Sequence, residues 1–267
     1  MATFNFYLST FNLNKLTPAI LTLLVFLLAQ GLGTALLFVI GMNATFLSLT
    51  LIAADILAVL CCYFLLHYIR FPATFDMRSV NWIPGSLAVA GGMLGAWSIS
   101  VLTEDVELPD EMMQMWLQMS NSIAGFLAVV IVGPITEELL FREAIIGEML
   151  RRGTNPWVAI TISALAFSAM HLTLAQFLYA LPLGILFGII YYRTGNIVLT
   201  SLLHILNNGT IAAELYTNGE EAAKFSYVEW FGSATTTYTY AALSAALCIM
   251  LITVFWNQYN PRERLQE

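Results

Sequence analysis

The sequence contains few charged residues and little positive charge. Only 10% of its 267 residues are charged, against about 25% in an ordinary soluble domain, which is too few to cover a soluble surface. A disordered chain is excluded because 59% of the residues are apolar. The net charge of −7 argues against a nucleic-acid partner, since phosphate binding requires clustered lysine and arginine. A polytopic membrane protein remains.

Cysteine and nucleophile motifs are also scarce. Cys61, Cys62 and Cys248 are too few for a disulfide framework, and they do not follow a zinc-knuckle spacing. The pair Cys61 and Cys62 has no histidine near it in the sequence except His67, so a cysteine nucleophile is disfavoured. The sequence has no G-x-S-x-G motif, which disfavours serine catalysis.

Long apolar runs fill most of the sequence. A bilayer core about 30 Å thick needs roughly 20 apolar residues per helix, and continuous rather than alternating runs favour helices over a barrel. We therefore predict an all-α, polytopic membrane helix bundle of about eight transmembrane helices, as a single membrane domain over residues 1–267. The predicted spans are 17–41, 45–69, 84–103, 121–149, 156–172, 174–192, 197–213 and 235–256.

Small and basic residues add detail to this bundle. Gly184 and Gly188 form a G-x-x-x-G motif that permits close helix approach. Of the ten basic residues, only Lys224 falls in the loops of one side, and Arg142 lies within a span. The other eight fall on the opposite side, a positive-inside pattern that predicts a cell-membrane protein with both termini in the cytoplasm. These eight are Lys15, Arg70, Arg78, Arg151, Arg152, Arg193, Arg262 and Arg264.

The opposite loops are acidic. Residues 104–111 contain five carboxylates and no basic group. The following segment 112–119, MMQMWLQM, is amphipathic. It is predicted either to lie at the membrane interface or to begin the fourth span.

Charged residues inside the span 121–149 mark a candidate functional site. A charge at the membrane centre costs at least about 2.5–3.5 kcal/mol. Glu138 and Arg142 are four residues apart in the favourable order, which predicts an ion pair. Glu137 lies about 100° further round the helix and is free to point elsewhere, and Pro134 is predicted to kink the helix. Two alternatives are that the glutamates only pack against Arg142, or that this part of the span lies among the lipid head groups.

Two of the three histidines lie in apolar spans. His171 ends the sequence F-S-A-M-H, and His204 begins H-I-L-N-N, so His204 and Asn208 share a helical face. A lone buried histidine is more often a hydrogen-bonded core residue, but two of them with an asparagine and a glutamate indicate a hydrolytic site. His67 follows the second span near Arg70 and is interpreted as an interfacial residue without a role.

The ordered motifs E-E-x-x-x-R, F-x-x-x-H and H-x-x-x-N resemble those of the CPBP intramembrane proteases. That family includes the eukaryotic CAAX prenyl endopeptidases and the bacterial Abi proteins linked to bacteriocin immunity. The motifs lie within residues 121–213, about a third of the chain. The resemblance implies that 121–213 is a catalytic core, and that the chain is an intramembrane endopeptidase acting on membrane-associated or lipidated peptides or proteins.

The resemblance also implies a role for each matching residue. Glu137 matches the catalytic glutamate that activates water, and His171 matches its partner in positioning that water. His204 and Asn208 match the pair that stabilises the oxyanion. No cofactor and no metal are implied.

The remaining motif residues are interpreted as supporting ones. Glu138 and Arg142 match the second glutamate and the arginine of the first motif. The residue after this arginine is often glycine in the family, and here it is Glu143. We expect this extra carboxylate either to alter the local charge or to face the lipid head groups.

Other functions stay open at this point. Two histidines and a glutamate can bind zinc, although no H-E-x-x-H motif is present. Intramembrane charges also occur in transporters, and a family member without activity would act as a scaffold or bacteriocin-immunity protein. The expected partners are membrane lipid and a peptide or protein substrate, without nucleic acid, and the sequence does not indicate an oligomeric state.

Overall fold

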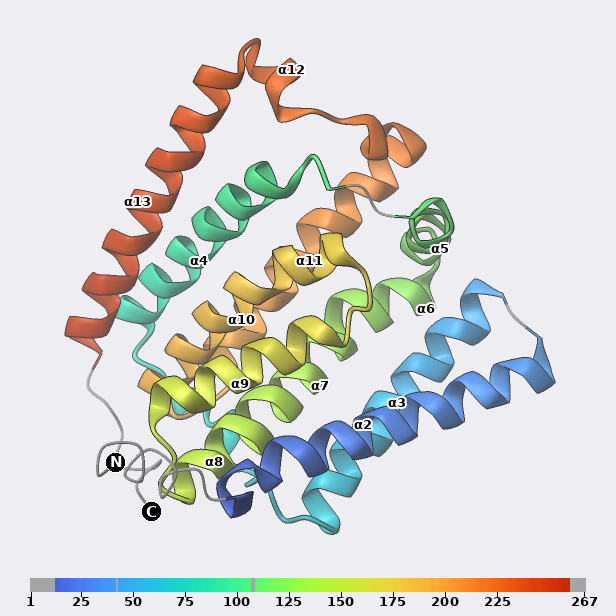
Figure 1. The fold of residues 1–267 in the computed structure, drawn as a ribbon, viewed down its shortest axis with the longest axis vertical. Coiled ribbons are helices and arrows are strands. Elements are labelled where there is room, and N and C mark those ends of the chain that lie inside the picture. Colours follow the sequence, from blue (N-terminus) through green and yellow to red (C-terminus); the bar gives the residue numbers. More distant parts are fainter. Residues whose placement is uncertain (1–12, 42, 107–108, 260–267) are drawn as a thin grey trace, which may run out of the picture.

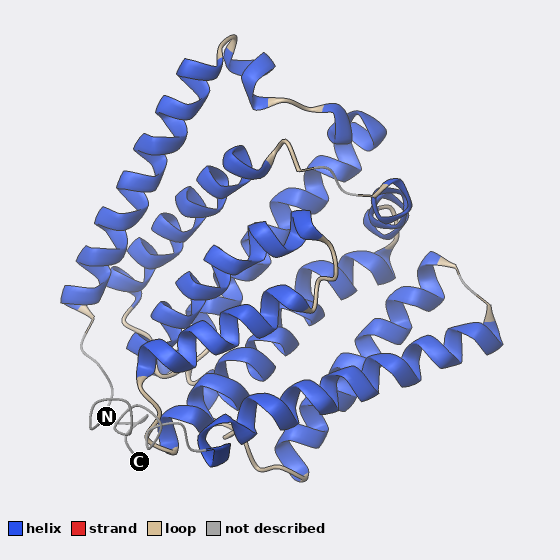
Figure 2. Cartoon of the chain, in the orientation of Figure 1, coloured by secondary structure: helices blue, strands red, loops and turns tan. Residues whose placement is uncertain are grey.

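A computed structural model describes residues 13–41, 43–106 and 109–259, and this part of the chain is helical without any strand (Figures 1 and 2). The all-α membrane helix bundle is therefore confirmed. The long helices are α2 (Leu13–Ile40), α3 (Ala44–Phe64), α4 (Trp82–Thr103), α10 (Leu174–Thr194), α11 (Val198–Asn218) and α13 (Ala234–Gln258). The short ones are α5 (Asp110–Ser120), α9 (Pro156–Ala169), α12 (Tyr227–Phe231), η1 (Ala73–Phe75), η2 (Met77–Ser79) and η5 (Gly219–Lys224).

The predicted span 121–149 forms a continuous helix whose hydrogen-bonding pattern changes four times. Two stretches are π-helical, with bonds between residues five apart. The segments in order are α6 (Ile123–Phe126), the π-helix η3 (Leu127–Val132), α7 (Gly133–Glu137), the π-helix η4 (Glu138–Gly147) and α8 (Glu148–Arg151). Pro134 lies between the two π-helical stretches, at the point where a kink was predicted.

Helices form at all eight predicted spans, but six of them are long and apolar enough to cross a membrane. These six make the chain a multi-pass membrane protein. Helix α9 has 14 residues and is therefore only about 21 Å long, less than the hydrocarbon core. Helix α11 is long enough, but Asn207, Asn208 and Glu214 interrupt its apolar sequence. The two predicted spans outside these six are therefore α9 and α11, whose sequences lead into or contain the two histidine motifs.

The helix 123–151 lies in the middle of the bundle (Figure 1). The pair α2 and α3 packs on one side of it, while α4 and α13 form a second pair on the other side, with α9, α10 and α11 between. A Cβ atom added at Gly184 would lie 3.1 Å from Ala164 Cα, and one at Gly188 would lie 2.8 Å from Ile160 Cγ2. The predicted G-x-x-x-G contact therefore joins α10 to α9.

The segment 112–119 belongs to the separate helix α5 and does not begin the membrane span. Figure 1 shows α5 nearly end-on, whereas α6 runs across the view, so the two helices point in different directions. A new helix starts at Ser122, whose hydroxyl accepts a hydrogen bond from the N–H of Gly125 at 2.9 Å. Leu117 is buried while Gln118 is exposed, so α5 is amphipathic as predicted.

Basic residues gather at one end of the bundle. Lys15 Nζ donates to Gly153 O at 2.8 Å, and Arg152 Nη1 donates to Asn14 O at 3.0 Å. These contacts bring the start of α2 against the turn after α8. Arg262 and Arg264 of the same predicted side lie outside the described residues.

Candidate active site

The predicted ion pair lies in the centre of the protein. Arg142 Nε is 3.1 Å from Glu138 Oε2, and the two side chains are 1% and 0% exposed. Every residue of η4 from Glu138 to Gly147 is buried. This part of the helix is therefore enclosed by neighbouring helices. The ion pair itself confirms the prediction made from the four-residue spacing.

His204 lies between the two glutamates. Its Nδ1 is 3.0 Å from Glu138 Oε1, and its Nε2 is 3.6 Å from Glu137 Oε2. An ionised Glu138 only accepts, so Nδ1 carries a proton. The Nε2 of the neutral ring is then an acceptor. Glu137 thus lies on the Nε2 side of His204 and Glu138 on its Nδ1 side.

Two phenylalanines enclose the guanidinium of Arg142. Its Cζ lies 4.7 Å from the ring centroid of Phe167 and 5.1 Å from that of Phe187. Among the described residues, Nη1 and Nη2 have no hydrogen-bond partner. Cation–π attraction and the charge of Glu138 therefore hold this buried cation. Phe167 is the first residue of the F-x-x-x-H motif, so the motif phenylalanine has a defined contact.

His171 reaches the same cluster from the turn after α9. The helix ends at Ala169, earlier than predicted, and Leu172 then adopts a left-handed φ of 63°. His171 Nδ1 lies 2.9 Å from Phe167 O; this carbonyl only accepts, so Nδ1 donates and Nε2 is an acceptor. The ring centroid of Phe167 lies 5.0 Å from that of His171 and 5.8 Å from that of His204.

Asn208 lies one turn after His204 on α11. Its Nδ2 donates to Val129 O in η3 at 3.0 Å. The structure thus brings Glu137, Glu138 and His204 into direct contact. Asn208 is connected to this cluster through its hydrogen bond to the backbone of η3. His171 is connected to it through the ring of Phe167, which packs against both His171 and His204.

A third carboxylate lies beside Glu137 and was given no role from the sequence. Asp55 in α3 is buried and accepts hydrogen bonds from Gln30 Nε2 at 2.7 Å and from Thr136 Oγ1 at 3.3 Å. Thr136 directly precedes Glu137 in the chain, so Asp55 lies next to the site. The signal in the sequence was a single acidic residue within an otherwise uncharged span.

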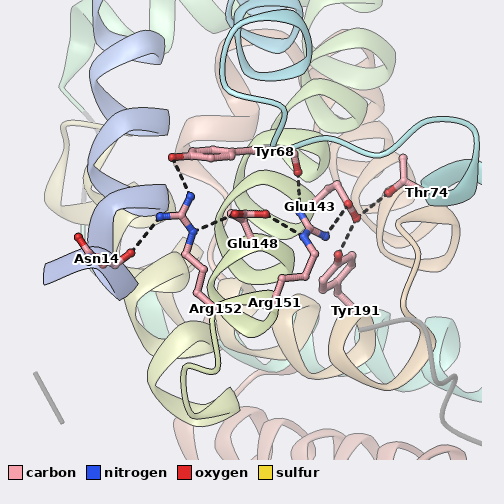
Figure 3. Close-up of polar contacts among 8 residues, drawn as sticks. All are labelled: Asn14, Tyr68, Thr74, Glu143, Glu148, Arg151, Arg152 and Tyr191. Carbon is pink, nitrogen blue, oxygen red and sulfur yellow. Dashed lines mark hydrogen bonds and ion pairs between the residues drawn. The ribbon is translucent and has the colours of Figure 1, made fainter. Parts of the chain in front are cut away.

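Glu143 belongs to a different network, at the basic end of the bundle (Figure 3). It is buried. Its Oε2 accepts from Tyr191 OH at 2.6 Å and from Thr74 Oγ1 at 2.9 Å. Its Oε1 pairs with Arg151 Nη1 at 3.1 Å. The expectation that this carboxylate faces lipid head groups is therefore wrong, because protein groups satisfy both of its oxygens.

Arg151 extends this network to two further elements. Its Nε is 2.8 Å from Glu148 Oε2, and its Nη2 donates to Tyr68 O at 2.7 Å. Arg152 Nε donates to the other oxygen of Glu148 at 2.8 Å (Figure 3). The end of the helix 123–151 is thereby fixed to the loop after α3.

The zinc alternative requires three protein ligands around one point. Within residues 13–41, 43–106 and 109–259, no three histidine, cysteine, aspartate or glutamate side chains are grouped so that they could hold a metal ion. His204 uses its Nδ1 for Glu138.

Comparisons with known proteins show which proteins the segment around this cluster resembles. Residues 119–210 match the family model of the type II CAAX prenyl endopeptidases, described as Rce1-like. The chain is 36% identical over 78 residues to YdiL of Bacillus subtilis, covering 29% of this chain and 32% of that protein. It is 29% identical over 101 residues to the membrane-embedded CAAX protease MroQ of Staphylococcus aureus, covering 36% of this chain and 41% of that protein. No solved structure gave a significant match.

A third relative is matched over a larger share of its own length. The UPF0177 protein YxdF of Lactococcus lactis is 29% identical over 141 residues, 49% of this chain and 73% of that protein. The matches to YdiL and MroQ each span less than half of those two proteins. The matched residues 119–210 contain all three motifs. Over this segment the chain is similar to CAAX-type membrane proteases.

Proposed function

We propose that this chain is an intramembrane endopeptidase that hydrolyses peptide bonds with a glutamate-activated water and without a metal. The observation that carries the proposal is the placement of Glu137 and Glu138 around one imidazole. Glu138 is fully buried and paired with Arg142, whereas the Glu137 side chain is 26% exposed. Two carboxylates in such different surroundings can take different roles.

The proposed mechanism assigns one task to each motif residue. Glu137 accepts the proton of the attacking water, and the free Nε2 of His171 holds this water in position. The Nδ2 group of Asn208 donates to the oxyanion, as does Nε2 of His204 when its ring is doubly protonated. Glu137 then returns the proton to the nitrogen of the leaving peptide.

The supporting pair keeps this arrangement in place. Arg142 holds the charge of Glu138, and Glu138 fixes the ring of His204 through Nδ1. We propose that residues 121–213 are the catalytic core of one membrane domain over 1–267.

The proposed substrate is a membrane-associated or lipidated peptide or protein. The match to the CAAX prenyl endopeptidase model and the printed name of the relative MroQ support this class. We also propose that the chain lies in the cell membrane with both termini in the cytoplasm. The clustering of Lys15, Arg151 and Arg152 at one end of the bundle supports this orientation.

The replacement Glu137→Gln tests the mechanism. It keeps the size of the side chain but removes the base, so the purified protein in detergent should stay folded and lose cleavage by about 10²-fold or more. Glu221→Gln changes an exposed glutamate on η5 and serves as the matched control, with wild-type activity expected. Activity retained by Glu137→Gln would refute the glutamate mechanism.

Two further experiments separate the alternatives and identify the substrate. Loss of cleavage in a strong chelator, restored by zinc, would favour the metalloprotease. A cellular phenotype restored equally by wild type and Glu137→Ala would favour a scaffold, immunity or transport role. A proteomic comparison of membrane peptides between wild-type and Glu137→Ala cells should show substrates that persist uncut in the variant.

A further inference from the structure

The backbone before the site leaves one carbonyl oxygen without a helical partner. In η3 the N–H of Gly133 donates to Ala128 O, five residues back. The N–H that would continue this pattern to Val129 O belongs to Pro134, which has none. The carbonyl of Val129 is therefore available to a side chain, and Nδ2 of Asn208 donates to it at 3.0 Å.

A chain of hydrogen bonds continues from Asn208. Its Oδ1 accepts from Nδ2 of Asn207 at 3.2 Å. Asn207 is 5% exposed, and its Oδ1 accepts from the hydroxyl of Tyr179 on α10 at 2.7 Å. The carbonyl of Val129 can only accept, so it fixes the direction of every bond in the chain. Each carboxamide is held with its Nδ2 toward Val129.

From this chain we infer that Asn207 and Tyr179 are positioning residues that set the orientation of the Asn208 carboxamide. The inference rests on the proposed function. One N–H of Asn208 is taken by Val129, and the other has no protein partner within the described segments, so it is available to the oxyanion. A flipped carboxamide would present an oxygen instead, which repels the oxyanion. The sequence motif contains Asn208 but gives no signal for Asn207 or Tyr179.

Two replacements interrupt the chain at different points. Asn207→Leu removes the group that donates to Asn208, and we expect kcat to fall by about 10- to 100-fold with KM nearly unchanged. Tyr179→Phe removes only the distant hydroxyl, so a smaller loss of about 3- to 10-fold is expected. Tyr192→Phe changes a tyrosine of the same helix that packs on Trp256. This control should keep wild-type kinetics.

A double-mutant cycle with Asn208→Ala tests whether Asn207 acts through Asn208. If it does, Asn207→Leu in the Asn208→Ala background causes no further loss of kcat. The inference is overturned if the two losses multiply, if Asn207→Leu keeps the wild-type kcat, or if it changes KM alone. Should Asn207→Leu fail to fold, Asn207→Asp keeps the size and the acceptor for Tyr179 and removes the donor to Asn208.

The same assay separates this inference from the proposed function. Cleavage that requires Glu137 but not Asn207 refutes only the positioning role. Wild-type protein that cleaves no better than Glu137→Gln refutes both. Thermal unfolding of each variant in detergent shows whether a loss of kcat accompanies a loss of fold.

Discussion

Replacing Arg142 by methionine is expected to destabilise the protein strongly. The guanidinium and the Glu138 carboxylate are 1% and 0% exposed, so the replacement leaves a negative charge in the interior without its cation. Breaking a buried pair in this way costs about 3–5 kcal/mol. The loss of the contacts with Phe167 and Phe187 at 4.7 and 5.1 Å adds about 1 kcal/mol or more.

The cost should fall when both partners are replaced. In the double variant Glu138→Gln, Arg142→Met no uncompensated charge remains, and the destabilisation should be smaller than the sum of the single effects by about 2 kcal/mol or more. Arg142→Lys keeps the charge but not the planar group between the rings, so its stability should be intermediate. The assay is unfolding in mixed detergent micelles, with helicity followed by circular dichroism.

Two results would refute this reasoning. Arg142→Met with wild-type stability would mean that water or another cation neutralises Glu138. Strictly additive single effects would mean that the two side chains do not interact energetically, despite the 3.1 Å contact.

Further predictions concern the groups around the site. Glu143→Gln removes a buried charge from the network of Figure 3, and the free energy of unfolding should fall by about 1–3 kcal/mol; an unchanged denaturation midpoint would contradict this. Gly188→Leu forces a side chain against Ile160 and should cost about 1–3 kcal/mol, while Gly31→Leu, with open space around it, should not. Asp55→Leu leaves a partly buried amide of α2 unpaired, so a loss of about 1–3 kcal/mol is expected by the same unfolding assay.

Much of the site is specified by local spacing. The four-residue separation of Glu138 and Arg142 predicts their ion pair, because residues four apart on a helix face each other whatever surrounds them. The lengths of the apolar runs predict the helices in the same way. The missing backbone donor of Pro134 also has a local effect, since it leaves a carbonyl of the preceding turn without its helical partner.

Contacts between helices required the tertiary structure. Glu138 and His204 are 66 residues apart, and their 3.0 Å contact depends on how η4 and α11 are rotated about their axes. The rotation is set by the packing of many side chains, which no single spacing encodes. Glu143 shows the same limit, because its partners Thr74 and Tyr191 come from distant segments.

The sequence by itself therefore determined the membrane class, the helices and the order of the three motifs. These follow from apolar length, charge scarcity and periodicity, which are local properties of the chain. Only the tertiary structure decided that His204 meets both glutamates, that Glu143 turns away from them, and that Asn207 and Tyr179 hold Asn208. Each of these is a contact between side chains whose position is fixed by the packing of separate helices.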